Sequence, residues 1–169
     1  MLQLAVSLDG FIEGPGGEFD WCFTDDDYGM TDFFKRIDAI FIGRKSYELA
    51  LSMGGTAPPG FPAFREYVFS DSLRIVEGNR VIVNGNLAEE VNKIKSQPGK
   101  DIWLYGGAAL TSSLINMNLV DEMALAVHPV LLGAGKPLFE NLSGRISLQL
   151  INSQTYPSGL VMLAYKFLT

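Results

Sequence analysis

The stretch that decides the fold is residues 38–48, DAIFIGRKSYE. Asp38–Ile42 is an apolar run rich in isoleucine, typical of a strand buried on both faces, and Gly43 ends it. A helix is expected directly afterwards, over Ser46–Met53, with Ser46 as its N-cap. A buried strand that passes straight into a helix is the repeating unit of a parallel sheet.

Similar units extend outward from this stretch in both directions. Apolar runs predict further strands over Leu2–Ser7, Glu66–Phe69, Arg80–Val83, Asp101–Tyr105 and Val120–Val127. Amphipathic segments predict helices over Thr31–Arg36, Leu87–Lys95 and Ala108–Met117. A Gly/Pro loop is expected over Gly54–Pro62, and a closing β-hairpin over Ser147–Tyr156 and Leu160–Leu168.

This order of elements predicts an α/β fold with a mostly parallel central sheet, helices on both faces and an antiparallel C-terminal hairpin. The 169 residues are enough for one domain, and no linker divides them. We therefore expect a single domain over residues 1–169. In such sheets ligands bind beyond the carboxyl ends of the strands, so the turns that leave the strands are the places to search for a site.

Charge and composition exclude several function classes. The net charge of −6 opposes binding to nucleic acid, and no run of about 20 apolar residues predicts a membrane span. The N-terminal segment lacks a basic region before its apolar run, so no signal peptide is expected. A single cysteine, Cys22, fits a reducing compartment, and we expect a cytoplasmic protein.

Two of the turns are suited to an anion. Gly43–Ser46 and Gly106–Ala108 each join a strand to a helix, where free backbone N–H groups attract phosphate. Arg44 adds a side chain that grips phosphate through two hydrogen bonds. The alternatives are that Arg44 is a solvated surface residue, that Ser46 only caps its helix, and that Gly106-Gly107 is a tight turn without a ligand.

Three further features have structural interpretations. Gly133-Ala134-Gly135-Lys136 lacks the upstream glycine of a P-loop. His128 is the only histidine, which excludes a multi-histidine metal site, so no metal is expected and a structural role is favoured. Cys22 has no basic neighbour in sequence and is expected to be inert.

The ordered set of motifs resembles the dihydrofolate-reductase-like superfamily, and specifically the reductase domain that forms the C-terminal half of the bifunctional deaminase–reductase of riboflavin synthesis. Five segments carry the resemblance: residues 5–12, AVSLDGFI; Trp21; residues 38–48; residues 105–107, YGG; and residues 120–122 with 128–135, VDE and HPVLLGAG. They span nearly the whole chain, and their order is more specific than any one of them.

The resemblance implies NADPH as cofactor. It implies that Arg44 and Ser46, beside Gly43, meet the adenosine 2′-phosphate and neighbouring phosphates, with Ser70 as a second contact. By the same resemblance, the cofactor-binding residues on the nicotinamide side are Gly106 and Gly107 beside the pyrophosphate and ribose, Ala5 beside the carboxamide, and Ile12 in the flap above the ring.

Other positions depart from the family. Dihydrofolate reductases place an acid on the helix after the tryptophan, and here Asp32 is the nearest residue in that register, so Asp32 is the predicted catalytic acid. The run Asp25–Asp27 is interpreted as solvated and helix-capping. Arg44 and Tyr105 stand where the riboflavin enzymes usually carry other residues, and no deaminase half accompanies the domain.

The combined prediction is an NADPH-dependent reductase that transfers a hydride to a small pterin or ribosylaminopyrimidine-type heterocycle. Trp21, Tyr47 and Tyr105 are the expected walls of the substrate pocket. The alternative is a non-catalytic nucleotide-binding or interaction module on the same fold. A homodimer is also expected, from the resemblance and from the apolar residues of the closing hairpin: Leu148, Leu150, Val161, Leu163 and Tyr165.

Overall fold

A computed structural model describes residues 1–54 and 61–168 of the protein. Most of the predicted loop Gly54–Pro62 lies outside these residues. The described strands are β1 (Leu2–Ser7), β2 (Phe11–Glu13), β3 (Ile37–Gly43), β4 (Arg65–Phe69), β5 (Arg80–Val83), β6 (Asp101–Gly106), β7 (Glu122–His128), β8 (Lys136–Pro137), β9 (Leu148–Thr155) and β10 (Val161–Phe167). The helices are α1 (Met30–Arg36), α2 (Arg44–Ser52), α3 (Leu87–Lys95) and α4 (Ala108–Asn116).

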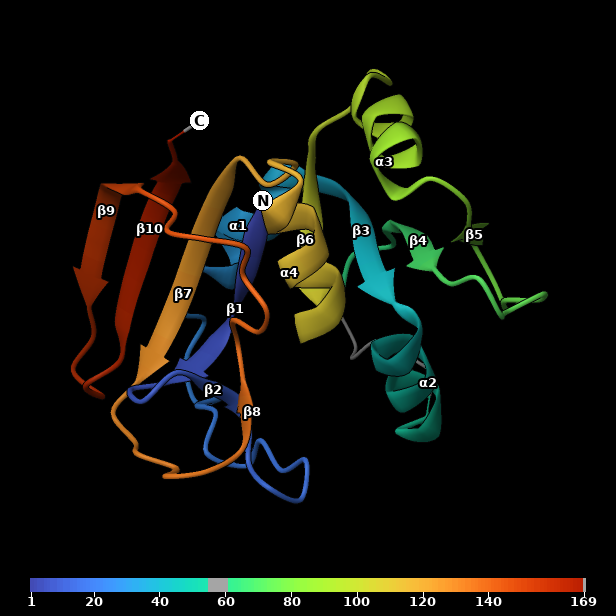
Figure 1. Cartoon of the computed structure of the whole chain (residues 1–169). Coiled ribbons are helices and arrows are strands. Elements are labelled where there is room, and N and C mark those ends of the chain that lie inside the picture. Colours follow the sequence, from blue (N-terminus) through green and yellow to red (C-terminus); the bar gives the residue numbers. More distant parts are fainter. Residues whose placement is uncertain (55–60, 169) are drawn as a thin grey trace.

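Eight strands form one sheet in the order β5-β4-β3-β6-β1-β7-β10-β9 (Figure 1). The pairs from β5 to β7 are parallel, whereas β10 runs antiparallel to both β7 and β9. The predicted α/β fold, with a mostly parallel sheet and an antiparallel closing hairpin, is therefore confirmed. A second, two-stranded antiparallel sheet, β2 with β8, was not expected from the sequence.

The helices cover both faces of the sheet, because each buried strand contributes alternate side chains to two cores. In β3, Ala39 and Phe41 join one core together with residues of α3 and α4. Ile40 and Ile42 join the other, with residues of α1 and α2. A continuous apolar run is the pattern that such a doubly covered strand requires.

The closing hairpin places an exposed strand at one edge of the sheet. Every residue of β9 is exposed, including Leu148, Leu150 and Ile151. An apolar, unpaired edge strand is a surface on which a second chain can pack. The homodimer stays a prediction, and light scattering at micromolar concentration tests it, since a monomer mass contradicts it. Among the described residues, no helix is long and apolar enough to cross a membrane.

Candidate functional site

Two helices begin side by side where the parallel strands end. α2 follows β3 and α4 follows β6, and β3 pairs directly with β6. The N-caps are Gly43 and Gly107, and neither helix has a side-chain cap. A Cβ added at Gly43 would lie 3.7 Å from both the Gly106 oxygen and the Gly107 nitrogen, so the two turns are in contact. Their free N–H groups form one electropositive corner.

The two glycines of the β6–α4 turn serve different purposes. Gly106 has φ 123°, a conformation that side chains disfavour. Gly107 has φ −82° and ψ −174°, which any residue can adopt at an N-cap. A Cβ there would lie 2.9 Å from Ser46 Oγ. At Gly107 it is therefore the space beside the Ser46 hydroxyl, and not the backbone conformation, that a side chain would disturb.

The sequence predicted that Ser46 caps α2, but the N-cap in the structure is Gly43. The helix begins two residues earlier, at Arg44, because Gly43 already supplies the extended N-cap conformation at φ −75° and ψ 153°. Ser46 consequently lies in the first turn, with its hydroxyl facing Gly107 of the neighbouring turn. Ser46 thus adds a donor to the corner that the two backbone turns form.

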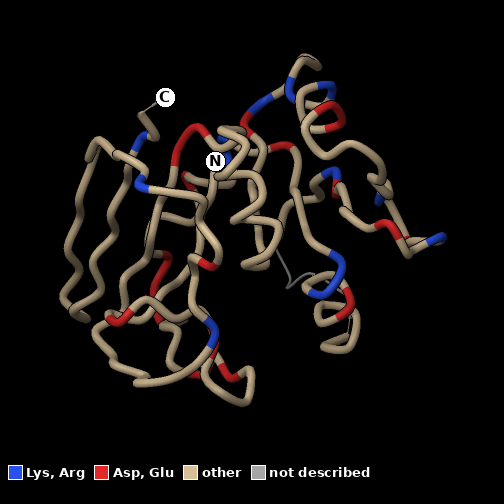
Figure 2. The backbone as a smooth tube through the Cα atoms, in the orientation of Figure 1, with Lys and Arg blue, Asp and Glu red and all other residues tan. Residues whose placement is uncertain are grey.

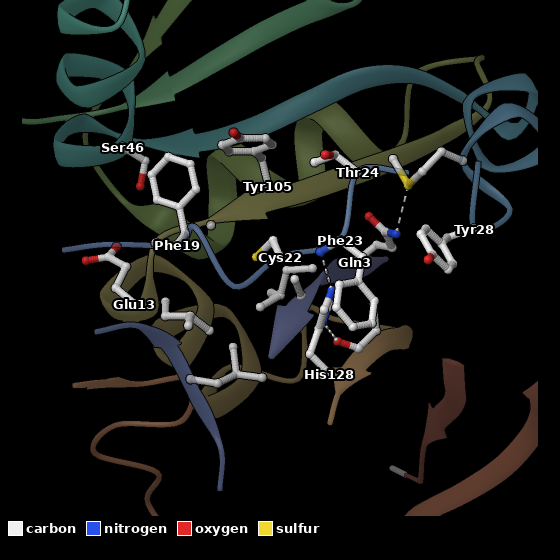
Figure 3. Close-up of a pocket in the computed structure, with 18 of the residues that line it drawn as sticks. Gln3, Glu13, Phe19, Cys22, Phe23, Thr24, Tyr28, Ser46, Tyr105 and His128 are labelled. Carbon is white, nitrogen blue, oxygen red and sulfur yellow. Dashed lines mark hydrogen bonds between the residues drawn. The ribbon is translucent and has the colours of Figure 1, made fainter. Parts of the chain in front are cut away.

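A cavity of about 600 Å³ extends from this corner across the end of the sheet. Its walls include five of the predicted cofactor-binding residues and one of the predicted pocket walls: Ala5, Ile12, Ser46, Gly106, Gly107 and Tyr105. The volume suits a ligand-binding site of ordinary size. Figure 3 shows Ser46, Phe19 and Glu13 at one end, and Gln3, Thr24 and Tyr28 at the other.

A buried hydroxyl without a partner lines the cavity near the helix corner. Thr111 is 1% exposed, and among the described residues its Oγ1 has no hydrogen-bond partner. It lies one turn into α4, and its backbone nitrogen donates to the Gly107 oxygen. A buried polar group left unpaired is costly, and this one belongs to a residue of the cavity wall.

Cationic side chains also stand near the same corner. Figure 2 shows basic residues at the start of α2. Arg44 Nη1 donates to Glu48 Oε1 at 2.9 Å, one turn along the helix. Lys136 Nζ lies 3.2 Å from Glu13 Oε1 and 3.9 Å from the position of a Cβ at Gly107. Both cations can move toward an anion at the helix corner because each has only a partly exposed carboxylate as its present partner.

The opposite end of the cavity is more apolar, with a few polar groups. Gln3 is 7% exposed, and its Nε2 donates to Met30 Sδ at 3.2 Å. His128 is buried, with its Nδ1 2.9 Å from the Ala126 oxygen and its Nε2 accepting from the Phe23 nitrogen at 3.1 Å. Burial lowers the pKa of His128, which favours the neutral ring that these bonds require. The histidine therefore holds the segment before α1 against β7.

Three predicted site residues lie elsewhere. Asp32 is 85% exposed on α1, pairs with Lys35 at 2.7 Å and is not among the cavity walls, which include Asp26 and Asp27 instead. Tyr47 is 4% exposed and packs in a core cluster, so it is not a pocket wall. These corrections share one cause: sequence spacing does not fix which way a short helix faces.

Trp21 is not a residue of the cavity wall and packs against His128, which is. Its ring lies 5.3 Å from the His128 ring at an interplanar angle of 81°, and its neighbours Cys22 and Phe23 line the cavity in its place. Its buried Nε1 has no partner among the described residues. Burial, together with Asp20, raises the pKa of the Cys22 thiol to about 11, so the thiol stays protonated and weakly nucleophilic at neutral pH.

Other predicted contacts lie at the same end of the sheet but outside the cavity walls. Ser70 follows β4, and its Oγ accepts hydrogen bonds from the backbone nitrogens of Ser72 and Leu73. Gly43 and Arg44 adjoin Ser46 without lining the cavity themselves. Their roles toward a cofactor stay predictions.

The P-loop-like sequence near the end of the chain has a structural role. The backbone nitrogens of Leu132 and Gly133 donate to the Asp9 carboxylate at 3.2 and 2.8 Å. These bonds, together with one from the Ser7 hydroxyl, lower the pKa of Asp9. The loop thereby fixes the turn between β1 and β2. Among the described residues no cluster of side chains is suited to hold a metal ion.

Sequence reasoning missed Thr111 and Gln3, and each has a recognisable signal. Thr111 lies four residues after Gly107, about one helical turn. Because side chains in a helix tilt toward its N-terminus, the Thr111 side chain lies near the turn at Gly107. Gln3 is a lone amide inside an apolar parallel strand, where a polar side chain is unusual. Alternation along β1 places Gln3 on the same face as Ala5, and both line the cavity.

Comparison with known proteins agrees with this geometry. The family model described as RibD C-terminal domain matches residues 1–162. YyaP of Bacillus subtilis (strain 168) is 46% identical, with 99% of this chain and 94% of that protein covered. The family resemblance inferred from the sequence is thereby confirmed.

Solved structures give the same fold. A candidate riboflavin biosynthesis protein of Shewanella sp. PV-4 is 25% identical with a TM-score of 0.87, over 99% of this chain and 98% of that one. The Thermotoga maritima diaminohydroxyphosphoribosylaminopyrimidine deaminase/5-amino-6-(5-phosphoribosylamino)uracil reductase is 12% identical, with a TM-score of 0.73 over 99% of this chain and 56% of that one. Enterococcus faecalis dihydrofolate reductase, solved with NADP(H) and RAB-propyl, is 14% identical, with a TM-score of 0.72 over 99% of this chain and 95% of that one.

Proposed function

We propose that this chain, which belongs to the RibD C-terminal domain family, is an NADPH-dependent reductase of a small heterocycle of the pterin or pyrimidine type. One observation carries the proposal: two uncapped helix N-termini meet at the wall of a cavity of about 600 Å³. A phosphate-bearing cofactor fits the corner, and the remaining space accepts a substrate beside it.

The residues at the corner fit a dinucleotide in three ways. The absence of a Cβ at Gly107 lets the Ser46 hydroxyl approach the start of α4, so that a hydroxyl and backbone N–H groups stand together at the corner. Thr111, a residue of the cavity wall, has a buried Oγ1 without a hydrogen-bond partner among the described residues. Arg44 and Lys136 supply positive charge within reach of the corner. Arg44 is the residue that we assign to the additional phosphate of NADPH, because its planar guanidinium grips phosphate through two parallel hydrogen bonds.

NADPH supplies a hydride when bound, and the chain holds the acceptor against it. The acceptor has a C=N or C=O bond, whose carbon takes the hydride and whose nitrogen or oxygen takes a proton from water. Ala5 and Ile12, the residues assigned to the nicotinamide side, both line the cavity. The apolar walls exclude bulk water from the reacting atoms.

Asp32 is not retained as the proton donor, because it lies outside the cavity. Of the two aspartates that do line it, Asp27 is engaged at the start of α1. Its Oδ1 accepts hydrogen bonds from the Thr31 hydroxyl at 2.6 Å and from the Thr31 nitrogen at 3.0 Å. These bonds lower the pKa of Asp27, so its carboxylate is ionised and holds the helix rather than donating a proton.

The relatives support the assignment of the reaction class. The Thermotoga maritima protein is named as a uracil-derivative reductase, and the Enterococcus faecalis enzyme is a dihydrofolate reductase solved with NADP(H). Both share the fold, and the family model covers almost the whole of this chain.

The test measures cofactor binding and turnover separately. Titration with NADPH and NADH, followed by tryptophan fluorescence, is expected to give tighter binding of NADPH. Oxidation of NADPH is then followed by absorbance with a panel of dihydropterins and aminopyrimidines. Equal affinity for the two cofactors contradicts the role of Arg44. Tight NADPH binding without turnover of any panel member overturns the reductase and leaves a nucleotide-binding module.

A further inference from the structure

The charges around the cavity are unevenly distributed. Lys136 and Arg44 stand near the helix corner, where the proposed cofactor needs them. At the opposite end, the charged residues that line the cavity are Asp26 and Asp27. No lysine or arginine is among the described residues that line the cavity, and residues 55–60, GTAPPG, contain none. The substrate end therefore offers an anionic ligand no cationic partner.

The basic residues of the neighbouring helix α1 lie outside the cavity wall. Lys35 Nζ lies 2.7 Å from Asp32 Oδ1, and its side chain is 70% exposed. Arg36 Nη2 lies 2.7 Å from Asp101 Oδ2 and 3.4 Å from Glu122 Oε2. Neither lines the cavity. A phosphate at this end would be desolvated beside two carboxylates, and that combination opposes binding.

Gln3 is a buried amide at this end, whereas the buried His128 already has both ring nitrogens engaged by backbone atoms. The Gln3 side chain makes one hydrogen bond among the described residues, to the sulfur of Met30, which is a weak acceptor. Figure 3 shows this side chain pointing into the cavity near Tyr28 and Thr24. A carboxamide presents a donor and an acceptor side by side in one plane. Its complement is the N–H and C=O edge of a cyclic amide, as in a pyrimidinone or a pterin.

We propose that the substrate is a flat, uncharged heterocycle without a phosphate group, whose amide edge is held by Gln3. The proposal rests on the proposed reductase function and narrows it. It separates this chain from the reaction in the name of the Thermotoga maritima protein, whose phosphoribosylaminouracil substrate carries a phosphate. The relevant substrate is then a free base or an unphosphorylated nucleoside.

The experiment compares two ligands that differ only by the phosphate. The full chain is saturated with NADP⁺ and titrated by calorimetry with 5-amino-6-(5-phosphoribosylamino)uracil and with its dephosphorylated nucleoside. We expect the nucleoside to bind at least about tenfold more tightly. The difference should shrink at high salt, because salt screens the repulsion from Asp26 and Asp27. Equal or tighter binding of the phosphorylated ligand overturns the proposal.

Variants of Gln3 test the amide contact. Gln3→Leu and Gln3→Glu should each weaken nucleoside binding about tenfold or more, while NADP⁺ affinity stays within about twofold. Gln154→Leu, on the exposed strand β9, is the matched control and should change neither affinity. Thermal unfolding checks that the variants fold, and Gln3→Glu keeps the side-chain shape if Gln3→Leu is unstable.

A charge reversal tests the electrostatic part. Asp26→Lys places a cation at the substrate end and should reduce or reverse the preference for the nucleoside. If the preference is unchanged, charge does not set it, and this part of the proposal is overturned. If neither ligand binds while NADP⁺ does, recognition by Gln3 is overturned, and only the cofactor site of the proposed function stands. If NADP⁺ itself does not bind, the proposed function is overturned, and this inference is overturned because it rests on that function.

Discussion

The free backbone N–H groups at the start of α3 are capped by a side chain, whereas those at the starts of α2 and α4 are not. At α3, the Asn86 side chain accepts hydrogen bonds from the Ala88 and Glu89 nitrogens, and two glutamates occupy the first turn. At α2 and α4, glycines stand at the N-cap, no side chain caps the helix and the first turn holds no acid. The positive end of α3 is neutralised from within, whereas the other two are left for a ligand.

The presence or absence of a side-chain cap distinguishes a helix start that is structural from one that is open to a ligand. Glycine at an N-cap costs only a few tenths of a kcal/mol relative to asparagine, so leaving a helix end open has a small effect on stability. Gly107 has dihedral angles that a capping residue adopts easily. The lack of a side chain at Gly107 therefore keeps the space beside it clear, and this space is at the wall of the cavity.

The largest loss of NADPH affinity is expected when the start of α4 is given a side-chain cap and an acid, as at the start of α3. Gly107→Asp supplies a side-chain cap and a negative charge at the helix N-terminus, which offset the cost of moving the Ser46 hydroxyl away from the new Cβ, so the variant should still fold. The same carboxylate occupies and repels the phosphate position. NADPH affinity should fall about a hundredfold or more, measured by fluorescence titration alongside thermal unfolding. Normal affinity in a folded variant would show that the corner is only structural.

The next effect concerns the charge at the α2 start. Arg44→Ala removes a charge-assisted contact to the additional phosphate of NADPH, worth about 1.5–3 kcal/mol, or about ten- to a hundredfold in affinity. NADH affinity should change little, because NADH lacks that phosphate. Lys93→Ala, on the exposed face of α3, is the control for a lost surface charge. An equal loss for both cofactors contradicts the assignment.

A smaller effect is expected at Ser46. Its hydroxyl faces Gly107 in the corner that the two turns share. Ser46→Ala removes one neutral hydrogen bond, worth about 0.5–1.5 kcal/mol, and should weaken NADPH binding roughly threefold to tenfold. If the hydroxyl had capped α2 instead, the variant would lower the free energy of unfolding without a change in affinity. Calorimetry and thermal unfolding of the same variant distinguish the two roles.

The smallest effect on binding is expected at the capped helix. Asn86→Ala removes two hydrogen bonds to the α3 start and should lower the free energy of unfolding by about 1 kcal/mol, equivalent to about 2–4 °C in Tm. NADPH affinity should stay unchanged, because α3 does not line the cavity. A loss of affinity here would remove the contrast between the two kinds of helix start.

How much of this was predictable depends on the range of the interactions involved. Arg80–Val83 and Leu87–Lys95 have the predicted bounds, because alternation, helical periodicity and the Asn86 cap are local signals. The start of α2 was misplaced by two residues, because Ser46 looked like a cap while Gly43 already served as one. Gly106 and Gly107 were found from a strand–turn–helix pattern, which is also local.

The substrate end was less predictable. Asp32 and Asp27 are the same residue type and close in sequence, yet Asp27 lines the cavity and Asp32 points to solvent. Tyr47 was expected to be a pocket wall and is a core residue instead, since its ring packs between α2 and the sheet. Neither outcome follows from residue type or spacing, because both depend on how a short helix is rotated against its neighbours.

The sequence by itself determined the alternation of strands and helices, the parallel sheet and the glycine turns, because hydrophobic periodicity and backbone preference act over a few residues. Only the tertiary structure decided that Gly43 and Gly107 lie in contact, that the Thr111 hydroxyl has no partner among the described residues, and that Gln3 faces the cavity. These residues are brought together by the crossing order of β3, β6 and β1, so their chemistry depends on long-range strand pairing. A site assembled from distant segments is decided by packing, whereas each segment is decided by its own residues.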